Sequence, residues 1–192
     1  MKTLVFLLEE PSAREMLKAL LPRILKTERV DPRFVVFQGF QGKQDLEKNV
    51  FRRISGWRSP ETSFLIVRDQ DSEDCRELKK RLLEACPVAS MPNVIVRIAC
   101  RELESFYLGD LKAIEEGLGI RGLSRRQESR KFRCPDVLVR PSAELDRMTK
   151  GKYQKISGSR AISPHLSLSG NRSVSFNALI QGIRKLVGEE NP

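Results

Sequence analysis

Four short runs of apolar, partly β-branched residues recur in the N-terminal half of the chain. They begin at Thr3, Arg33, Ser63 and Asn93, so each run starts 30 residues after the one before it. This spacing is the length of a βαβ unit, and alternating strand and helix patterns are typical of a mainly parallel sheet. We therefore predict an α/β fold with a central sheet of about four strands and helices on both sides.

The stretches between these runs have apolar residues at helical spacing. Ser12 and Glu15 form a capping-box pattern, which predicts a helix that begins at Ser12. Leucines and other apolar residues continue this helix to Ile24 on one stripe, although Pro22 removes one backbone donor. Two further helical stretches are expected at residues 45–54 and 74–86.

After Ala99 the regular alternation stops. Helical spacing predicts helices at residues 102–110, 113–118, 143–148 and about 173–187, whereas residues 119–131 and 151–173 are rich in Gly, Ser and charge and are predicted to be loops. We therefore expect a core at residues 1–110 and a basic, mixed helical and loop extension at residues 111–192. The extension is expected to pack on the core within one compact domain.

Positive charge is concentrated in the C-terminal part. The 192 residues have a formal net charge of +10, and residues 121–172 alone contain 13 Lys or Arg against 4 Asp or Glu. Such a segment favours a polyanionic partner, above all nucleic acid, although a solvated basic surface is the ordinary alternative. Lys152, Tyr153, Lys155 and Arg160 are the expected basic patch.

The four cysteines, Cys75, Cys86, Cys100 and Cys134, contain no C-x-x-C pair that could begin a zinc site. Reduced thiols in the cytoplasm are the expected state. The apolar run after Thr3 ends in two acids rather than in a cleavage site, and no stretch approaches the ~20 apolar residues of a membrane span. We expect no membrane association.

Acidic residues follow three of the predicted strands. Glu9 and Glu10 follow the first, Asp69 and Asp71 the third, and Glu104 follows the fourth by a few residues. Because ligands of parallel sheets bind beyond the carboxyl ends of the strands, these acids are expected to converge. Residues two apart in an extended segment point the same way, so Asp69 and Asp71 are expected to present their carboxylates to one point. Hard oxygen donors without nearby His or Cys suit Mg²⁺ or Mn²⁺.

A structural interpretation of the third acidic group is also open. Asp71 or Ser72 could serve as the N-cap of the helix that begins near Asp74, and acids in its first turn favour the positive end of the helix dipole. For this group alone, capping is the simpler explanation. The recurrence of acids at three strand ends favours an ion site.

The motifs "LVFLLEE" and "FLIVRDQD" resemble the strand-Glu and strand-Asp-x-Asp patterns of the Toprim domain of topoisomerases, primases and OLD-type nucleases. Over almost its full length the chain resembles a bacterial family of uncharacterised Toprim-like proteins, through "EEPSAREML", "FQGKQDL", "VRDQDS", "RELESFYLGD", "GKYQKISGSRAI" and "SFNALIQGIRKL". Similar proteins are thought to be encoded beside an ATPase of the AAA or ABC type, in arrangements that look like phage defence.

The resemblance implies roles for individual residues. Glu9 is the implied general acid or base, and Asp69 and Asp71 are the implied Mg²⁺ ligands. Glu104 is the implied second-metal ligand, and Lys155 the implied phosphate contact with a catalytic role. Most Toprim domains have Gly directly after the first Glu. Here Glu10 follows instead, so either acid could be catalytic, and Glu10 is also a candidate metal ligand.

Lys43 follows the second strand, so we expect it at the same edge, in contact with phosphate. The leading hypothesis is a Mg²⁺-dependent or Mn²⁺-dependent Toprim-type nuclease that acts on DNA or RNA with an ATPase partner. A non-catalytic subunit that binds nucleic acid or the ATPase is the alternative. A receiver-like phosphoacceptor ranks last, since it requires a fifth strand. Self-association is compatible with all three.

Overall fold

The computed structural model describes residues 3–28, 32–59, 61–87 and 93–188, and within them the predicted α/β fold is confirmed. The strands form one parallel sheet in the order β2-β1-β3-β4. Their bounds are β1 Thr3–Leu8, β2 Val35–Gly39, β3 Thr62–Asp69 and β4 Val94–Ala99. In register, Leu8 lies opposite Gly39 of β2 and Val67 of β3, so the carboxyl ends of the strands meet at one edge of the sheet.

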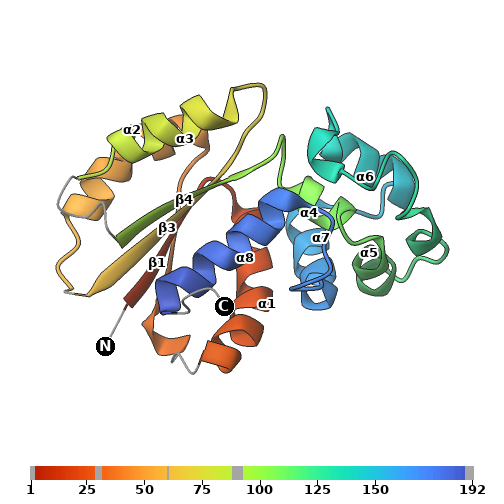
Figure 1. Ribbon diagram of the computed structural model, residues 1–192, viewed down its shortest axis with the longest axis horizontal. Helices are drawn as coiled ribbons and strands as arrows, with labels where there is room; N and C mark the ends of the chain where they lie inside the picture. Colours follow the sequence, from red (N-terminus) through yellow and green to blue (C-terminus); the bar gives the residue numbers. More distant parts are fainter. Residues whose placement is uncertain (1–2, 29–31, 60, 88–92, 189–192) are drawn as a thin grey trace.

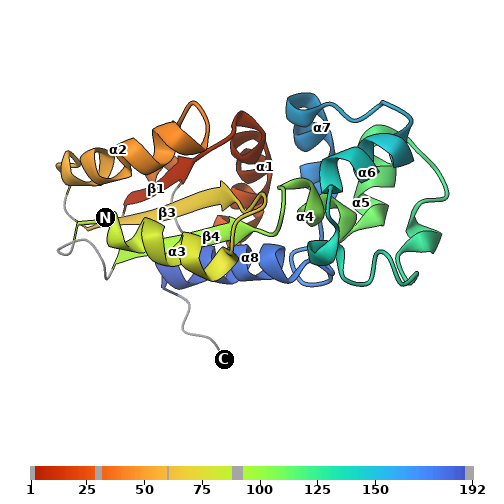
Figure 2. The same ribbon diagram turned by 90° about the horizontal axis from the view of Figure 1, so that it is seen from above.

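Helices cover both faces of the sheet (Figures 1 and 2). The α-helices are α1 Pro11–Glu28, α2 Lys43–Ser55, α3 Cys75–Glu84, α4 Glu104–Leu108, α5 Leu111–Leu118, α6 Pro141–Thr149, α7 Lys155–Ile162 and α8 Val174–Val187. Short 3-10 turns are η1 Pro32–Phe34, η3 Ser124–Arg126, η4 Pro135–Val137 and η5 Ser163–His165.

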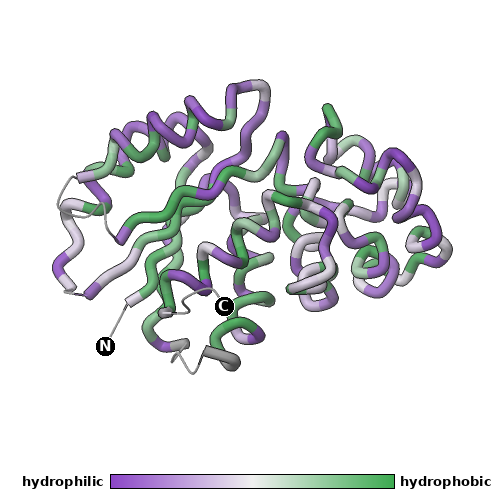
Figure 3. The backbone as a smooth tube through the Cα atoms, in the orientation of Figure 1, coloured by the Kyte–Doolittle hydropathy of each residue, from purple (hydrophilic) through white to green (hydrophobic). Residues whose placement is uncertain are grey.

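Two apolar clusters, one on each face, hold the layers together. One joins the sheet to α2 and α3, and the other joins it to α1, α8 and the helices that follow β4. Figure 3 shows largely hydrophobic strands, and polar and apolar residues that alternate along α2 and α3. Alternation at helical spacing is expected for helices with one buried face.

The C-terminal part forms a helical lobe beyond the carboxyl ends of the strands, made of α4 to α7 and their connections (Figure 2). α8 then returns to the sheet beside β4. Nε of Arg97 on β4 donates to the carbonyl oxygen of Ala178 at 2.7 Å, and a side chain at Gly182 would collide with the Arg97 guanidinium. These contacts hold α8 close to β4. The carboxyl edge of the sheet itself faces the lobe of α4 to α7 (Figure 2).

One predicted loop is a helix. Residues 155–162, within the stretch predicted to be irregular, form α7, which packs against α1 and α5. A side chain at Gly158 would lie 2.4 Å from the Tyr153 ring, and one at Gly117 of α5 would lie 2.6 Å from the backbone of Ala161. The small residues that made this stretch look like a loop therefore allow close packing of helices. Sequence periodicity does not reveal this role.

The predicted start of α3 near Asp74 is confirmed, but the cap residues suggested for α1 and α3 are wrong. α1 begins at Pro11 rather than at a Ser12 cap, and the Ser12 hydroxyl donates to Glu10 instead, at 3.0 Å. The N-cap of α3 is Asp74, whose carboxylate accepts from the backbone N–H groups of Arg76 and Glu77. Neither Asp71 nor Ser72 caps α3, since a capping side chain reaches only two or three residues ahead.

Two further expectations concern strands and membranes. Within the described ranges the sheet has four strands, so the fifth strand of a receiver-like fold is not among them. No described helix is long and apolar enough to cross a membrane.

Candidate functional site

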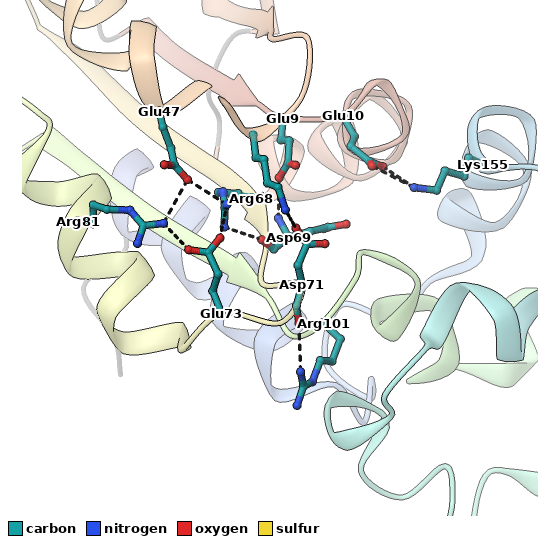
Figure 4. A network of polar contacts seen from close by, with 11 residues as sticks. Glu9, Glu10, Glu47, Arg68, Asp69, Asp71, Glu73, Arg81, Arg101 and Lys155 are labelled. Carbon is teal, nitrogen blue, oxygen red and sulfur yellow. Dashed lines mark hydrogen bonds and ion pairs between the residues drawn. The ribbon is translucent and has the colours of Figure 1, made fainter. Parts of the chain in front are cut away.

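The ends of β1 and β3 bring Glu9 and Asp69 into direct contact. The backbone N–H of Asp69 donates to Oε2 of Glu9 at 3.1 Å, and both side chains are buried, with 8% of each residue exposed. Figure 4 shows them together at the carboxyl edge of the sheet. The predicted convergence of acids from the first and third strands is therefore present in the structure.

Asp71 lies in a turn, so the expectation of an extended segment from Asp69 to Asp71 is wrong. Its φ is +55°, and Arg101 after β4 has a φ of +62°. The two turns hold each other, because the Asp71 N–H donates to the Arg101 carbonyl at 2.8 Å and Arg101 Nη1 donates to the Asp71 carbonyl at 3.2 Å. Left-handed backbone at non-glycine residues often occurs at functional sites.

Each of the two more exposed acids has a lysine partner from another element. Nζ of Lys43, the first residue of α2, lies 2.8 Å from Oδ2 of Asp71. Nζ of Lys155, the first residue of α7, lies 3.0 Å from Oε1 of Glu10 (Figure 4). Both lysines therefore stand at the acidic edge, as predicted, and contact carboxylates there.

Glu104 is the most deeply buried acid of the group, with 0% of its surface exposed. The Tyr153 hydroxyl donates to its Oε1 at 2.9 Å, while Oε2 is buried without a hydrogen-bond partner. Tyr153 itself is 5% exposed, so its predicted role as a nucleic-acid contact is wrong. The tyrosine supports Glu104 instead, because its ring is enclosed by Gly158 and Tyr107.

Burial and mutual repulsion disfavour the ionised carboxylates. Desolvation raises the pKa of Asp69 well above its usual range, and the charges of Glu10, Glu104 and Glu9 raise it further. Desolvation also raises the pKa of Glu9 and of Glu104, against hydrogen bonds that lower it. Such shifts in a cluster of like charges are typical of functional sites.

The same acids stabilise the charged form of Lys155. Its partial burial opposes the charged ammonium, but the hydrogen bond to Glu10 and the charges of Glu10, Glu104 and Asp69 outweigh burial and raise the pKa of the lysine. A hollow of about 430 Å³ adjoins this pair, between the end of β1 and the first residues of α2 and α7. Glu9, Glu10, Gly42 and Lys155 are among its lining residues.

The acidic edge fits a divalent cation in donor chemistry and in charge. Asp69, Glu9 and Glu104 offer hard oxygen donors, and the orphaned Oε2 of Glu104 lacks the partner that buried carboxylates normally have. In their present conformations, no three His, Cys, Asp or Glu side chains of the described residues form a ready-made metal group. Binding of an ion thus requires side-chain rotation at this edge.

A buried arginine beside the acids was not predicted. Arg68 is 1% exposed, and its Nη2 lies 2.9 Å from Glu47 of α2 and 2.5 Å from Glu73. Arg81 of α3 closes the ring by pairing with the same two glutamates (Figure 4). A charged residue in an otherwise apolar strand run was the sequence signal. This ring ties α2 and α3 to the end of β3 and holds the residue before Asp69.

The remaining predicted basic residues lie away from the acids. Lys152 is exposed on the segment that leads to α7. Nε of Arg160 pairs with Oε2 of Glu15 at 2.7 Å and links α7 to α1. The structure therefore brings Lys43 and Lys155 to the acidic edge, whereas Arg160 lies at the contact of α7 with α1 and Lys152 is exposed.

The model of the family described as a domain of unknown function, DUF4276, matches residues 8–184. The chain belongs to this family. Among solved structures, the C-terminal region of the Burkholderia pseudomallei OLD protein has a similar fold, with a TM-score of 0.57 and 14% sequence identity. The match covers 98% of this chain and 100% of that chain. No curated protein matches the chain.

The expected membership of an uncharacterised family with an OLD-related fold is therefore confirmed. The fold of this DUF4276 protein places Glu9 and Asp69 at the end of a parallel sheet and surrounds them with a helical lobe. At 14% identity the likeness to the OLD region concerns the fold.

Proposed function

We propose that this DUF4276 protein is a metal-dependent nuclease of the Toprim type, which hydrolyses phosphodiester bonds of nucleic acid. The observation that carries the proposal is the convergence of Glu9, Asp69 and Glu104 from three strand ends at one buried, repulsive edge. A structural ion pair would relieve this repulsion with a nearby cation, but the two lysines at the edge pair with Asp71 and Glu10 instead. Mg²⁺ or Mn²⁺ would supply the positive charge that these buried carboxylates lack.

Asp69, Asp71 and Glu104 are the proposed metal-holding residues, and Glu10 is a further candidate. When bound, the ion supplies charge stabilisation on the phosphorus oxygens. Glu9 is the proposed proton-transfer residue, because burial raises its pKa towards the range in which a carboxyl group can both take up and release a proton. Glu10 is the alternative, being adjacent in sequence and paired with Lys155.

Lys155 and Lys43 are the proposed phosphate contacts. Each forms an ion pair with a carboxylate on the solvent side of the edge, and an incoming phosphate offers the same charge-assisted hydrogen bonds. Lys155 is the proposed stabiliser of charge during cleavage, because it lies beside the hollow that Glu9 and Glu10 line. Cooperation with an ATPase in phage defence is the biological setting that the family resemblance suggests.

Metal-dependent stabilisation tests this proposal. Thermal unfolding of the wild type is measured with and without Mn²⁺, in parallel with an Asp69→Asn/Asp71→Asn variant. An ion at about 100 times its dissociation constant adds about 2.7 kcal/mol, which the variant is expected to lose. Asp74→Ala is the matched control, since it removes a nearby carboxylate that only caps α3 and is expected to keep the Mn²⁺ shift.

Cleavage assays follow with linear and circular DNA and with RNA in Mg²⁺ and Mn²⁺. Metal-dependent cleavage by the wild type that the Asp69→Asn/Asp71→Asn variant lacks supports the proposal. Full cleavage by the variant, or an equal Mn²⁺ shift in both proteins, contradicts the assignment of these residues.

One observation favours the second candidate function, a subunit that binds nucleic acid or an ATPase without catalysis. The Lys43–Asp71 and Lys155–Glu10 pairs already neutralise part of the edge without an ion. This candidate predicts no Mn²⁺ shift and binding that weakens with salt but does not need metal.

A further inference from the structure

The irregular segment at residues 121–140, between α5 and α6, is strongly basic and rich in arginine. It contains six Arg and one Lys against two acids, Glu128 and Asp136. Arginine offers a planar set of donors that matches phosphate oxygens, whereas lysine acts as a point charge. The preference for arginine therefore points to recognition of an oxyanion, beyond simple solubility.

These arginines are exposed and largely without acidic partners. Within the described part of the chain, none of the six forms an ion pair with a carboxylate, and the Arg126 guanidinium makes a cation–π contact with the Phe132 ring. The six, here called the arginine surface, are Arg121, Arg125, Arg126, Arg130, Arg133 and Arg140. By contrast, Lys43, Lys155 and Arg160 elsewhere all pair with acids.

The segment has little regular secondary structure, yet buried anchors fix its backbone. Gln127 accepts a hydrogen bond from the Leu111 N–H at 2.7 Å and donates to the carbonyls of Leu108 and Phe132. Phe132 is 1% exposed, and Glu115 accepts from the N–H groups at the start of the segment. Long irregular segments that are held in this way are commonly functional, because the scaffold presents their side chains in fixed positions.

The arginine surface lies on the segment that joins α5 to α6 in the helical lobe (Figures 1 and 2). A hollow of about 320 Å³ adjoins it, with an apolar lining of Leu138, Val139 and Ala143 and a rim that includes Arg140. Lys131 and Arg147 also line the hollow, where Glu144 pairs with both. An apolar lining beside Arg140, which forms no ion pair among the described residues, suits a sugar or base next to a phosphate.

We infer that the arginine surface binds the sugar–phosphate backbone of nucleic acid, independently of sequence, and holds the substrate while the acidic edge acts on it. This inference rests on the proposed function, which makes nucleic acid the substrate. The contacts are electrostatic, so binding falls with salt and needs no divalent metal. An anionic membrane is the less fitting partner, since Phe132, the aromatic residue of the segment at residues 121–140, is 1% exposed and offers no ring to a membrane interface.

The test measures binding of a fluorescent DNA duplex and a fluorescent single strand of the same sequence in a chelator, over a series of salt concentrations. An Arg125→Gln/Arg130→Gln/Arg133→Gln variant is compared with the wild type. Arg76→Gln/Lys79→Gln/Lys80→Gln is the matched control, because it removes the same charge from exposed positions on α3, a helix that packs on the sheet and is not part of the helical lobe.

The arginine variant is expected to bind at least about tenfold more weakly at low salt, with a salt slope smaller by about three for duplex DNA, while the α3 variant keeps most of its affinity. Equal loss in both variants, or none in either, overturns the inference. Equal binding of the wild type to vesicles of anionic phospholipid also overturns it, in favour of a general anionic surface.

The experiment separates this inference from the proposed function. Binding is measured without metal, so failure of the arginine surface leaves the Mn²⁺ shift and the cleavage assay untouched. Conversely, an Asp69→Asn/Asp71→Asn variant is expected to bind DNA like the wild type but neither to cleave it nor to respond to Mn²⁺. This result would show that DNA binding and cleavage depend on different residues.

Discussion

Nζ of Lys155 lies 3.0 Å from Oε1 and 3.2 Å from Oε2 of Glu10, although 145 residues separate the two in sequence. The contact joins the first turn of α7 in the helical lobe to the end of β1 in the sheet. Lys155 thereby places a cation beside the most buried acids of the protein. Its position follows from the packing of the lobe against the sheet edge.

Replacement of Lys155 by Met is expected to abolish most cleavage while changing stability little. The ion pair is half exposed on the lysine side, and such pairs contribute about 0 to 1 kcal/mol. Cleavage rate and unfolding free energy are measured on the same preparation. A Lys152→Met variant, which removes an exposed lysine of the same segment, is expected to cleave at nearly the wild-type rate. Loss of activity that merely follows loss of folded protein contradicts the role of Lys155.

The buried Arg68 is expected to matter far more for stability than its ring partner Arg81. Arg68→Met removes the ion pairs with Glu47 and Glu73 and the hydrogen bond to the Asp69 carbonyl, and it is expected to cost about 1.5 to 3 kcal/mol. Arg81→Met removes contacts to the same glutamates from a side chain that is 48% exposed, and it is expected to cost less than about 1 kcal/mol. Urea unfolding of both variants checks the order, and the reverse order contradicts it.

Acid is expected to weaken the connection between α1 and α7. Hydrogen bonds from Arg160 and Lys18 lower the pKa of Glu15 below its ordinary value of 4.5. A lowered pKa in the folded state contributes stability that is present above pH 4.5 and is lost as the pH falls through the folded value. Glu15→Gln is thus expected to destabilise the protein near neutral pH, with a difference from wild type that shrinks below pH 4.5.

Unfolding free energies at neutral and acidic pH measure this difference. Glu84→Gln, which removes an exposed carboxylate without a described ion pair, serves as the control. A difference for Glu15→Gln that stays constant across the pH range contradicts the ion-pair explanation.

The close packing of α5 and α7 predicts sensitivity at Gly117. A methyl group there would lie 2.6 Å from the Ala161 carbonyl oxygen and from the Ile162 Cα, so Gly117→Ala is expected to cost about 1 to 3 kcal/mol. At Gly39, where an added Cβ meets no atom within 4 Å, the same change is expected to alter stability by at most about 0.5 kcal/mol. Similar costs at both positions, measured by thermal or urea unfolding, contradict the packing account.

Much of the sheet was predictable because its signals are local. Runs such as residues 64–67 are apolar on both sides of the strand, and the spacing of these runs predicts parallel strands with helices between them. Parallel strands place their carboxyl ends at one edge, which is why the meeting of Glu9 with Asp69 was predictable, whereas the strand order β2-β1-β3-β4 comes from the structure. Sequence periodicity also predicted α8, which carries a broad apolar stripe and begins at a Ser173 cap.

The contacts around the acids of the candidate site depend on tertiary structure. The composition of α7 resembles a loop, and only the close approach of Gly158 to the Tyr153 ring and of Gly117 to Ala161 explains why it is a helix. That packing buries Tyr153 against Glu104 and carries Lys155 to Glu10. The amino-acid sequence thus determined the parallel sheet and the acids at its edge through local periodicity. The surroundings of those acids were decided by contacts between distant segments, which no local pattern encodes.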